Sequence, residues 1–441
     1  MHLFAALLQR RCLISTVPAN NTTKLFWSTL PSFKLLVRRR HFNFERTIHI
    51  STTRWQNAVT LKVQGPHEED KDDHEQQLLN QLQNVEGETQ TLKIEEDTPS
   101  DTEWRIMSEH FNGVQNLEMN TGFNEELNDE KIPVHWPVKR LLISSACAEV
   151  FRSPFVLEGR VKHLILLLTS GLRFEGPTTA DLCRANKEAI ARGETEAEYM
   201  TLHKGTPEER KIELTIVPKL VFNWLRNKYT TQDASSYPAI PIPGQIGTET
   251  LEVLENDAID TFTRMTLALP HIVENLKTLN LRSSSGLDFH FTSKEMFQEA
   301  LPQLTGLRTF VFTVGEVFNE DDYLPLLFQH FPPNLSTLRF RGPVSLSKSK
   351  HWNKWVGSFA DPKYLPNLRR LSFVLDLDYD KESTGRKKVI RAQKERLSEA
   401  KAACKELFDN VKKRGIAIEP FCDEWAEKYK AFEQVDERCE Q

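Results

Sequence analysis

Residues 276–281 read Leu-Lys-Thr-Leu-Asn-Leu, and the same apolar frame returns three more times before residue 374. The later copies occupy residues 307–312, 335–340 and 368–373, so the frame recurs every 28 to 33 residues. Positions 1, 4 and 6 of each copy are apolar. Because a unit of this length cannot bury its own apolar face, the recurrence predicts stacked strand-plus-helix units that share one core.

Three weaker copies of the frame precede these four, starting at Val114, Val138 and Val161. Their spacings of 24 and 23 residues are shorter than those of the later copies. Alternation along a short strand directs positions 4 and 6 toward the core and positions 3, 5 and 7 toward the opposite, concave surface. The predicted fold class is therefore α/β, a solenoid of parallel strands backed by helices, with a disordered N-terminal region.

Between the two groups of frames the pattern disappears for more than a hundred residues, and Leu251 to Val273 are predicted as one helix that leads into the strand at Leu276. This interruption is expected to be an insertion of helices and loops. The chain divides into a targeting-like segment 1–54, an acidic linker 55–101, N-terminal repeats 102–177, an insertion 178–268, C-terminal repeats 269–380 and a helical cap 381–441.

The N-terminal segment is strongly basic, with nine Lys or Arg residues and the single acid Glu45 before residue 55. An arginine-rich, acid-poor opening with hydroxyl residues is typical of a mitochondrial transit peptide, and residues 46–54 resemble the processing region of fungal mitochondrial presequences. The alternatives are a basic tail or a misassigned start codon, with a cytoplasmic or nuclear location. No apolar run approaches the roughly 18–20 residues of a membrane-spanning helix.

The next block, residues 68–103, holds thirteen acids against Lys71 and Lys93. Because so polar a segment buries little apolar surface, it is expected to be a disordered linker with one short amphipathic helix around Leu78. The alternative is an acidic interaction tail.

At the other end of the chain, an apolar stripe from Val389 to Val411 predicts a helix, Gly415 predicts its end, and residues 416–418 predict a last strand. Stacked repeats need a polar cap over their terminal core. The tail is therefore predicted to be that cap, and the alternative is a partner-binding coiled coil.

No known catalytic or cofactor motif is present, and the six cysteines include no C-x-x-C pair. We therefore predict no catalytic residue, no cofactor and no metal, with His163 as a surface or packing residue. Asp376, Asp378 and Asp380 alternate after the last frame, but Lys381 stands where a calcium loop needs glycine. A strand that runs out into a solvated acidic loop is expected there. An enzyme with a site in the 178–268 insertion is the alternative.

Over roughly residues 102–425 the Leu-x-x-Leu-x-Leu frames and their intervening helices resemble the leucine-rich-repeat superfamily, in the irregular style of fungal F-box-associated repeat proteins. No segment before residue 102 resembles an F-box. The resemblance implies a binding scaffold without catalytic activity. Leucine-rich-repeat proteins that assist the assembly of respiratory complexes are similar in kind, and such a role suits a mitochondrial presequence.

Projecting the frame outward predicts a basic concave face, which is either a solvated charged surface or a groove that binds an acidic segment of a protein partner, because arginine pairs bidentately with carboxylate. RNA is the alternative ligand, although the outward positions lack the aromatic side chains that stack on bases. Changing Arg339 and Arg341 together to Glu is expected to abolish partner capture and leave the melting temperature nearly unchanged. The predicted partner-binding residues are Arg140, Arg282, Arg308, Arg339, Arg341 and Arg370, flanked by Lys139, Lys162, Lys277 and Arg369.

Overall fold

The structure is a computed structural model. It describes residues 58–66, 71–120, 129–144, 150–167, 173–174, 201–202, 212–213, 247–255, 258–283, 300–315, 323–381 and 387–422. The segment 1–54 and most of the insertion 178–268 lie outside these residues, and so do the transit-peptide and insertion-site hypotheses.

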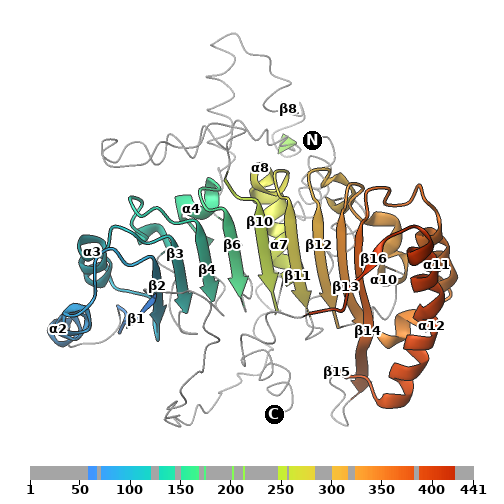
Figure 1. Ribbon diagram of the computed structural model, residues 1–441. Helices are drawn as coiled ribbons and strands as arrows, with labels where there is room; N and C mark the ends of the chain where they lie inside the picture. Colours follow the sequence, from blue (N-terminus) through green and yellow to red (C-terminus); the bar gives the residue numbers. More distant parts are fainter. Residues whose placement is uncertain are drawn as a thin grey trace, which may run out of the picture.

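A mostly parallel sheet, twelve-stranded within the described ranges, runs through the molecule with helices packed along it, which makes the fold α/β (Figure 1). Strands that follow one another in the chain are mostly neighbours in the sheet. The parallel strands, in order, are β1 (Ala58–Lys62), β2 (Thr91–Glu95), β3 (Asn116–Asn120), β4 (Arg140–Ser144), β6 (His163–Leu167), β10 (Thr250–Leu254), β11 (Thr278–Ser283), β12 (Thr309–Val314), β13 (Thr337–Pro343) and β14 (Arg370–Lys381).

The remaining elements are short or lie beside this sheet. Among the described residues, two small two-stranded sheets pair β5 (Val150–Phe151) with β7 (Arg173–Phe174) and β8 (Thr201–Leu202) with β9 (Ile212–Glu213). The helices and helical turns are α2 (Lys71–Leu82), α3 (Asp101–His110), η1 (Asp129–Lys131), α4 (Pro154–Leu157), α7 (Ala258–Ala268), α8 (Pro270–Val273), η4 (Leu301–Gln303), α10 (Tyr323–Leu326), η5 (Leu327–His330), η6 (Val344–Lys348), α11 (Trp352–Ala360) and α12 (Lys394–Lys413).

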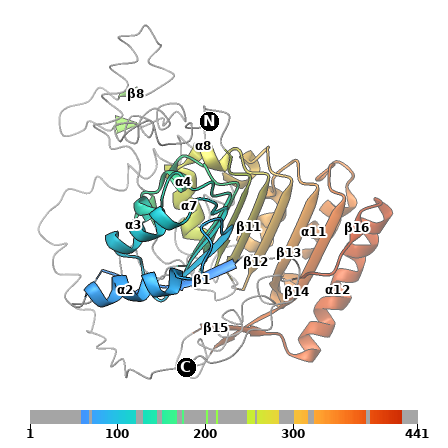
Figure 2. The same cartoon turned by 60° about the vertical axis from the view of Figure 1, so that its left-hand side comes forward.

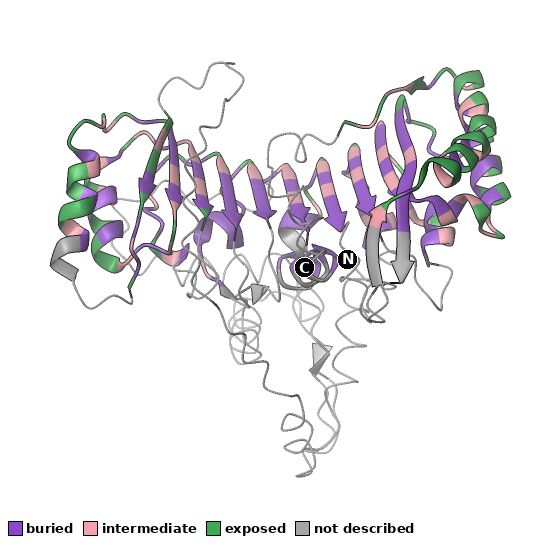
Figure 3. Cartoon of the chain, turned by 90° about the horizontal axis from the view of Figure 1, so that it is seen from below, coloured by how far each residue is buried: buried purple, intermediate pink, exposed green. Residues whose placement is uncertain are grey.

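Position 4 of the frame pairs with position 4 of the next unit across the sheet, from Val59 on β1 to Leu371 on β14. Positions 4 and 6 are buried in all seven copies that the sequence predicts. The sheet is curved, and α7 lies against its convex side (Figure 3). Because the frame residues of all units point to this side, they form one continuous core with the helices.

Helix α11 illustrates how a connecting segment reaches the core. Trp352, Trp355, Val356 and Phe359 recur at helical spacing and are all buried. The Trp355 ring lies 5.6 Å from that of Phe340 and 5.8 Å from that of Phe373, measured between centroids. The phenylalanine at position 6 of each of the strands β12, β13 and β14 therefore matches an aromatic helix on the convex side.

The prediction of a disordered linker over 55–101 is wrong for the described residues of that range. They form β1, α2 and β2, and α2 buries Leu78. The frame of β2 begins with Thr89 in place of an apolar residue, and its Oγ1 donates a 2.7 Å hydrogen bond to the carbonyl of Glu86. Because this polar side chain is buried with a hydrogen bond in place of apolar contacts, a search for apolar residues at position 1 does not find the unit.

The predicted helix from Leu251 to Val273 is wrong for the same physical reason. Residues 250–254 are strand β10, which lies between β6 and β11, and only α7 and α8 are helical. Position 1 of this unit is Thr248, whose Oγ1 donates a 2.7 Å hydrogen bond to the carbonyl of Val161. The C-terminal end of the predicted insertion is thus a unit of the main sheet.

The last strand is longer than predicted. β14 continues to Lys381 and pairs with an antiparallel strand, β15 (Lys387–Arg391), so Asp376 and Asp378 are buried and not in a solvated loop. Val389, predicted as helical, lies in β15, whereas the helix from Lys394, the left-handed Gly415 (φ 74°) and the strand β16 (Ala417–Ile418) agree with the prediction.

Different helices pack against the two ends of the sheet. Helices α2 and α3 lie beside β1, and α12 lies beside β14 and β16 at the opposite end (Figure 2). Arg414 joins α12 to α11 by donating hydrogen bonds to the carbonyls of Phe359, Tyr364 and Leu365. Within the described ranges, no helix combines the length and the apolar character needed to cross a membrane.

A buried carboxyl group makes folding pH-dependent. Asp129 accepts backbone N–H hydrogen bonds from Arg152 and Ser153. Burial raises its pKa from 3.8 to about 7, against the opposing effect of those hydrogen bonds and with a further increase from Glu130. Because the folded protein holds this proton more tightly than the unfolded chain, the associated stability is present below about pH 3.8 and is lost as pH rises through about 7.

We therefore expect the free energy of unfolding, measured by urea denaturation, to fall between pH 5 and pH 7 in the wild type. Asp129→Asn removes the titrating group and should flatten this slope. The partly exposed neighbour Glu130, changed to Gln, serves as the control and should keep most of the slope, because its effect on the pKa of Asp129 is smaller than that of burial. An unchanged slope in Asp129→Asn would contradict the assignment.

Candidate functional site

Several of the predicted partner-binding arginines are neutralised by carboxylates on neighbouring strands. Arg140 Nη1 lies 2.6 Å from Glu118 Oε1, and Lys93 Nζ lies 3.1 Å from Glu118 Oε2. Burial raises the pKa of Glu118, but Lys93 and Arg140 together outweigh it and hold the pKa below its ordinary value. This pairing follows from the register, which places Arg140 on the strand beside Glu118.

Arg282 and Arg341 are also paired inside the protein. Arg282 is buried and forms an ion pair with the buried Glu255 at the end of β10. Arg341 binds Asp376 bidentately, with Nε 2.8 Å from Oδ1 and Nη2 3.2 Å from Oδ2. The double change of Arg339 and Arg341 to Glu thus cannot leave stability unchanged, because it places a carboxylate against Asp376.

The middle of the concave face carries a group of polar side chains beside a cluster of apolar ones, so it is not a continuous basic groove. His163 Nε2 lies 2.7 Å from Glu252 Oε1, and Asn280 donates a 2.7 Å hydrogen bond to the other oxygen of Glu252. Beside this group a second apolar cluster is buried at outward positions of β4, β6 and β10. It consists of Leu142, Ile165, Leu167 and Leu254.

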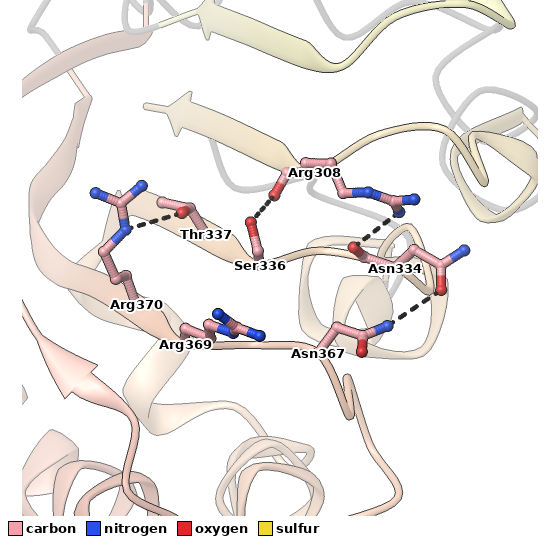
Figure 4. Close-up of a pocket in the computed structure, with 7 residues that line it drawn as sticks. All are labelled: Arg308, Asn334, Ser336, Thr337, Asn367, Arg369 and Arg370. Atoms are coloured by element: carbon pink, nitrogen blue, oxygen red, sulfur yellow. Dashed lines mark hydrogen bonds between the residues drawn. The ribbon is translucent and has the colours of Figure 1, made fainter.

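Arg308 and Arg370 instead line a pocket of about 550 Å³ at the edge where β12, β13 and β14 begin (Figure 4). Arg308 Nη1 donates to the carbonyls of Thr305 and Asn334 at 3.3 and 3.2 Å, and Arg370 Nε donates to Thr337 Oγ1 at 3.2 Å. We call this the arginine pocket. Its lining residues are Arg308, Asn334, Ser336, Thr337, Asn367, Arg369 and Arg370.

Positive charge is in excess around the arginine pocket. The carboxylate of Glu419 lies 3.9 Å from Arg370 and 4.0 Å from Arg339, beyond hydrogen-bond distance. Arg308 and Arg369 form no ion pair with any other described residue. Of the three arginines that line the pocket, Arg370 alone lies near a carboxylate among the described residues, so an anion entering the pocket would meet an unbalanced positive charge.

The pocket continues a row of exposed cations along the edge where the parallel strands begin. These residues occupy position 2 of their frames, and neighbouring strands lie about 4.8 Å apart. The acid Glu249 interrupts the row, pairing with Lys277 at 2.8 Å and Lys162 at 3.9 Å, and the hydrogen bond from Lys277 lowers the pKa of Glu249. We call this row the basic edge: Lys139, Lys162, Lys277, Arg308 and Arg369.

Sequence reasoning missed the carboxylates Glu255, Asp376 and Glu419, because their partners are set by strand register and by the return of β16 to the sheet. It also missed Asn334, Ser336 and Asn367 in the pocket. A signal was present: an asparagine precedes position 1 in several frames, and position 2 is basic in most of them.

Within the described part of the chain, no group of three or more His, Cys, Asp or Glu side chains is arranged to hold a metal ion. Cys404 is buried in α12, and burial raises the pKa of its thiol to about 12, so it is a poor nucleophile at neutral pH. A comparison with protein families finds no family model that matches the chain, and none of the curated proteins matches it.

Proposed function

We propose that this protein is a non-catalytic scaffold, a leucine-rich-repeat-like solenoid that binds an acidic segment of a protein partner along the basic edge. The observation that carries the proposal is the row of exposed cations that ends in the arginine pocket, where Arg370 alone of the three lining arginines lies near a carboxylate, Glu419, among the described residues. Extended acidic chains suit such a row, because arginine and lysine can each pair with successive carboxylates.

Two features favour a protein ligand over RNA. The described outward positions 3, 5 and 7 carry no Phe, Tyr or Trp on which bases could stack. In addition, Glu249 on the basic edge and Glu118 and Glu252 on the concave face would repel a continuous phosphate backbone. A partner with a mixed sequence can place its own cations or neutral residues there.

The setting that we propose is the mitochondrion, with a role in the assembly of a protein complex. This rests on the composition of residues 1–54 and on the resemblance to leucine-rich-repeat assembly factors. A fluorescent protein fused behind residues 1–54 should co-localise with a mitochondrial marker. Diffuse cytoplasmic or nuclear fluorescence would contradict the setting while leaving the binding proposal intact.

The binding proposal predicts a large effect of charge reversal on the basic edge. We expect the triple change Lys277→Glu, Arg308→Glu and Arg369→Glu to weaken binding of a fluorescein-labelled peptide of alternating Glu and Gly by at least about tenfold, measured by fluorescence anisotropy. The three side chains are exposed, so the midpoint of urea denaturation should change little.

The matched control reverses three exposed lysines on α12: Lys401, Lys405 and Lys412. It changes net charge by the same amount and should leave peptide affinity within about twofold, because screening limits the reach of charges to roughly 10 Å at 0.1 M salt. Equal loss in both variants would show a net-charge effect and contradict the proposal. Tighter binding of a single-stranded RNA of the same charge would favour the RNA alternative.

A further inference from the structure

The arginine pocket exists because one residue of the basic edge is small. Position 2 is Arg308 on β12, Ser336 on β13 and Arg369 on β14, and these strands are successive neighbours in the sheet. With a strand spacing of about 4.8 Å, the two arginine backbones lie about 10 Å apart on either side of the serine. Ser336 Oγ donates a 3.1 Å hydrogen bond to the carbonyl of Arg308, which keeps the serine side chain out of the hollow.

The walls of this hollow are polar on every side that the described residues form. Asn367 Nδ2 donates a 3.3 Å hydrogen bond to Asn334 Oδ1, and Asn334 Nδ2 donates to the carbonyl of Thr305. Figure 4 shows the Arg308 and Arg369 side chains extending along the same side of the pocket as these two asparagines. The lining includes no apolar side chain, so the pocket suits a polar, charged group.

The arrangement of the two guanidinium groups distinguishes between anions. A planar carboxylate presents its two oxygens in one plane, and pairing both with one arginine fork leaves only their outer lone pairs for a second arginine. A tetrahedral phosphate presents oxygens in several directions and carries about −1.5 to −2 charge at neutral pH. The backbones of Arg308 and Arg369 lie about 10 Å apart. When both side chains lean over Ser336, each guanidinium group can lie about 4 Å from one phosphorus atom between them.

We propose that the arginine pocket binds the phosphate monoester of a phosphorylated serine or threonine, held between Arg308 and Arg369 above Ser336. The inference rests on the proposed function, because it places this residue within the acidic segment that follows the basic edge. The pocket is continuous with that edge through Lys277 on β11, the strand next to Arg308. A phosphorylated side chain therefore anchors the segment at one end while carboxylates pair with the lysines beyond it.

The test compares fluorescein-labelled peptides of sequence Gly-Glu-Glu-X-Glu-Glu-Gly, in which X is phosphoserine or glutamate, by fluorescence anisotropy with the full chain. We expect the phosphoserine peptide to bind at least about tenfold more tightly, as is typical when charge-assisted hydrogen bonds are added. The double change Arg308→Gln and Arg369→Gln should abolish this preference. The control, Lys401→Gln and Lys405→Gln on α12, removes the same charge and should retain it.

Equal binding of the two peptides, or a preference that survives the arginine changes, would overturn the inference. If both peptides still bind and both lose affinity on charge reversal of the basic edge, the proposed function stands while the phosphate site falls. Binding of neither peptide would remove both. The last experiment adds inorganic phosphate as a competitor of the peptide. If phosphate displaces the peptide at concentrations near the peptide's own dissociation constant, the pocket is a site for free phosphate, which contradicts the proposal.

Discussion

Arg341→Glu is expected to lower the free energy of unfolding by about 3–5 kcal/mol, because it breaks a largely buried ion pair and leaves the partner uncompensated. Arg341 and Asp376 are only 16% and 12% exposed in their side chains, and two hydrogen bonds join them. The new carboxylate would also face Asp376 across β13 and β14. Urea denaturation followed by tryptophan fluorescence would measure the loss.

Arg339→Glu is the matched control for this experiment, since it reverses the same charge two residues away on the same strand. Arg339 lies 4.0 Å from Glu419 and is more exposed, so its cost should stay within about 1 kcal/mol. A second test replaces both partners, Arg341→Met with Asp376→Leu, and should recover part of the loss because no buried charge remains unpaired. Similar costs for Arg339→Glu and Arg341→Glu would contradict the role given to the pair.

Trp355→Ala is expected to have an effect of similar size, about 3–5 kcal/mol, because it opens a large cavity in the aromatic part of the core. The side chain is fully buried, and its ring lies 5.6 Å from Phe328 and 5.8 Å from Phe331 between centroids. Its Nε1 donates a 2.8 Å hydrogen bond to the carbonyl of Pro325. Thermal and urea denaturation would both report the change.

Trp355→Phe separates the two contributions. It keeps an aromatic ring in the core and removes the hydrogen bond to Pro325, so we expect a smaller cost than for alanine, with about 1 kcal/mol from the lost hydrogen bond. A cost within about 1 kcal/mol for Trp355→Ala would mean that α11 does not hold the units of β12 to β14 together. The aromatic matching between this helix and the strands would then be incidental.

Much of the sheet could be predicted from the chain alone, because burial of apolar residues at positions 4 and 6 repeats in every unit. Two of the failures share a physical cause. Thr89 and Thr248 occupy position 1 of units whose Oγ1 hydrogen bonds replace apolar contacts, so the units containing β2 and β10 look polar in sequence. Many acidic residues also surround β2. Such a polar block resembles a linker in sequence, because its few apolar residues do not show which distant residues pack against them.

The candidate site depended on information that only neighbouring strands supply. Sequence identified the arginines, but whether each is neutralised is decided by the pairing of β3 with β4, which brings Glu118 within 2.6 Å of Arg140, and by the positions of Glu255 just after β10 and of Asp376 within β14. At the edge, Arg308 and Arg369, which form no ion pair with any other described residue, stayed exposed. The sequence by itself thus determined the repeating core and the presence of the arginine and lysine side chains. Tertiary structure alone decided which cations remain available to a partner, because an ion pair depends on distances across the sheet that a linear pattern does not contain.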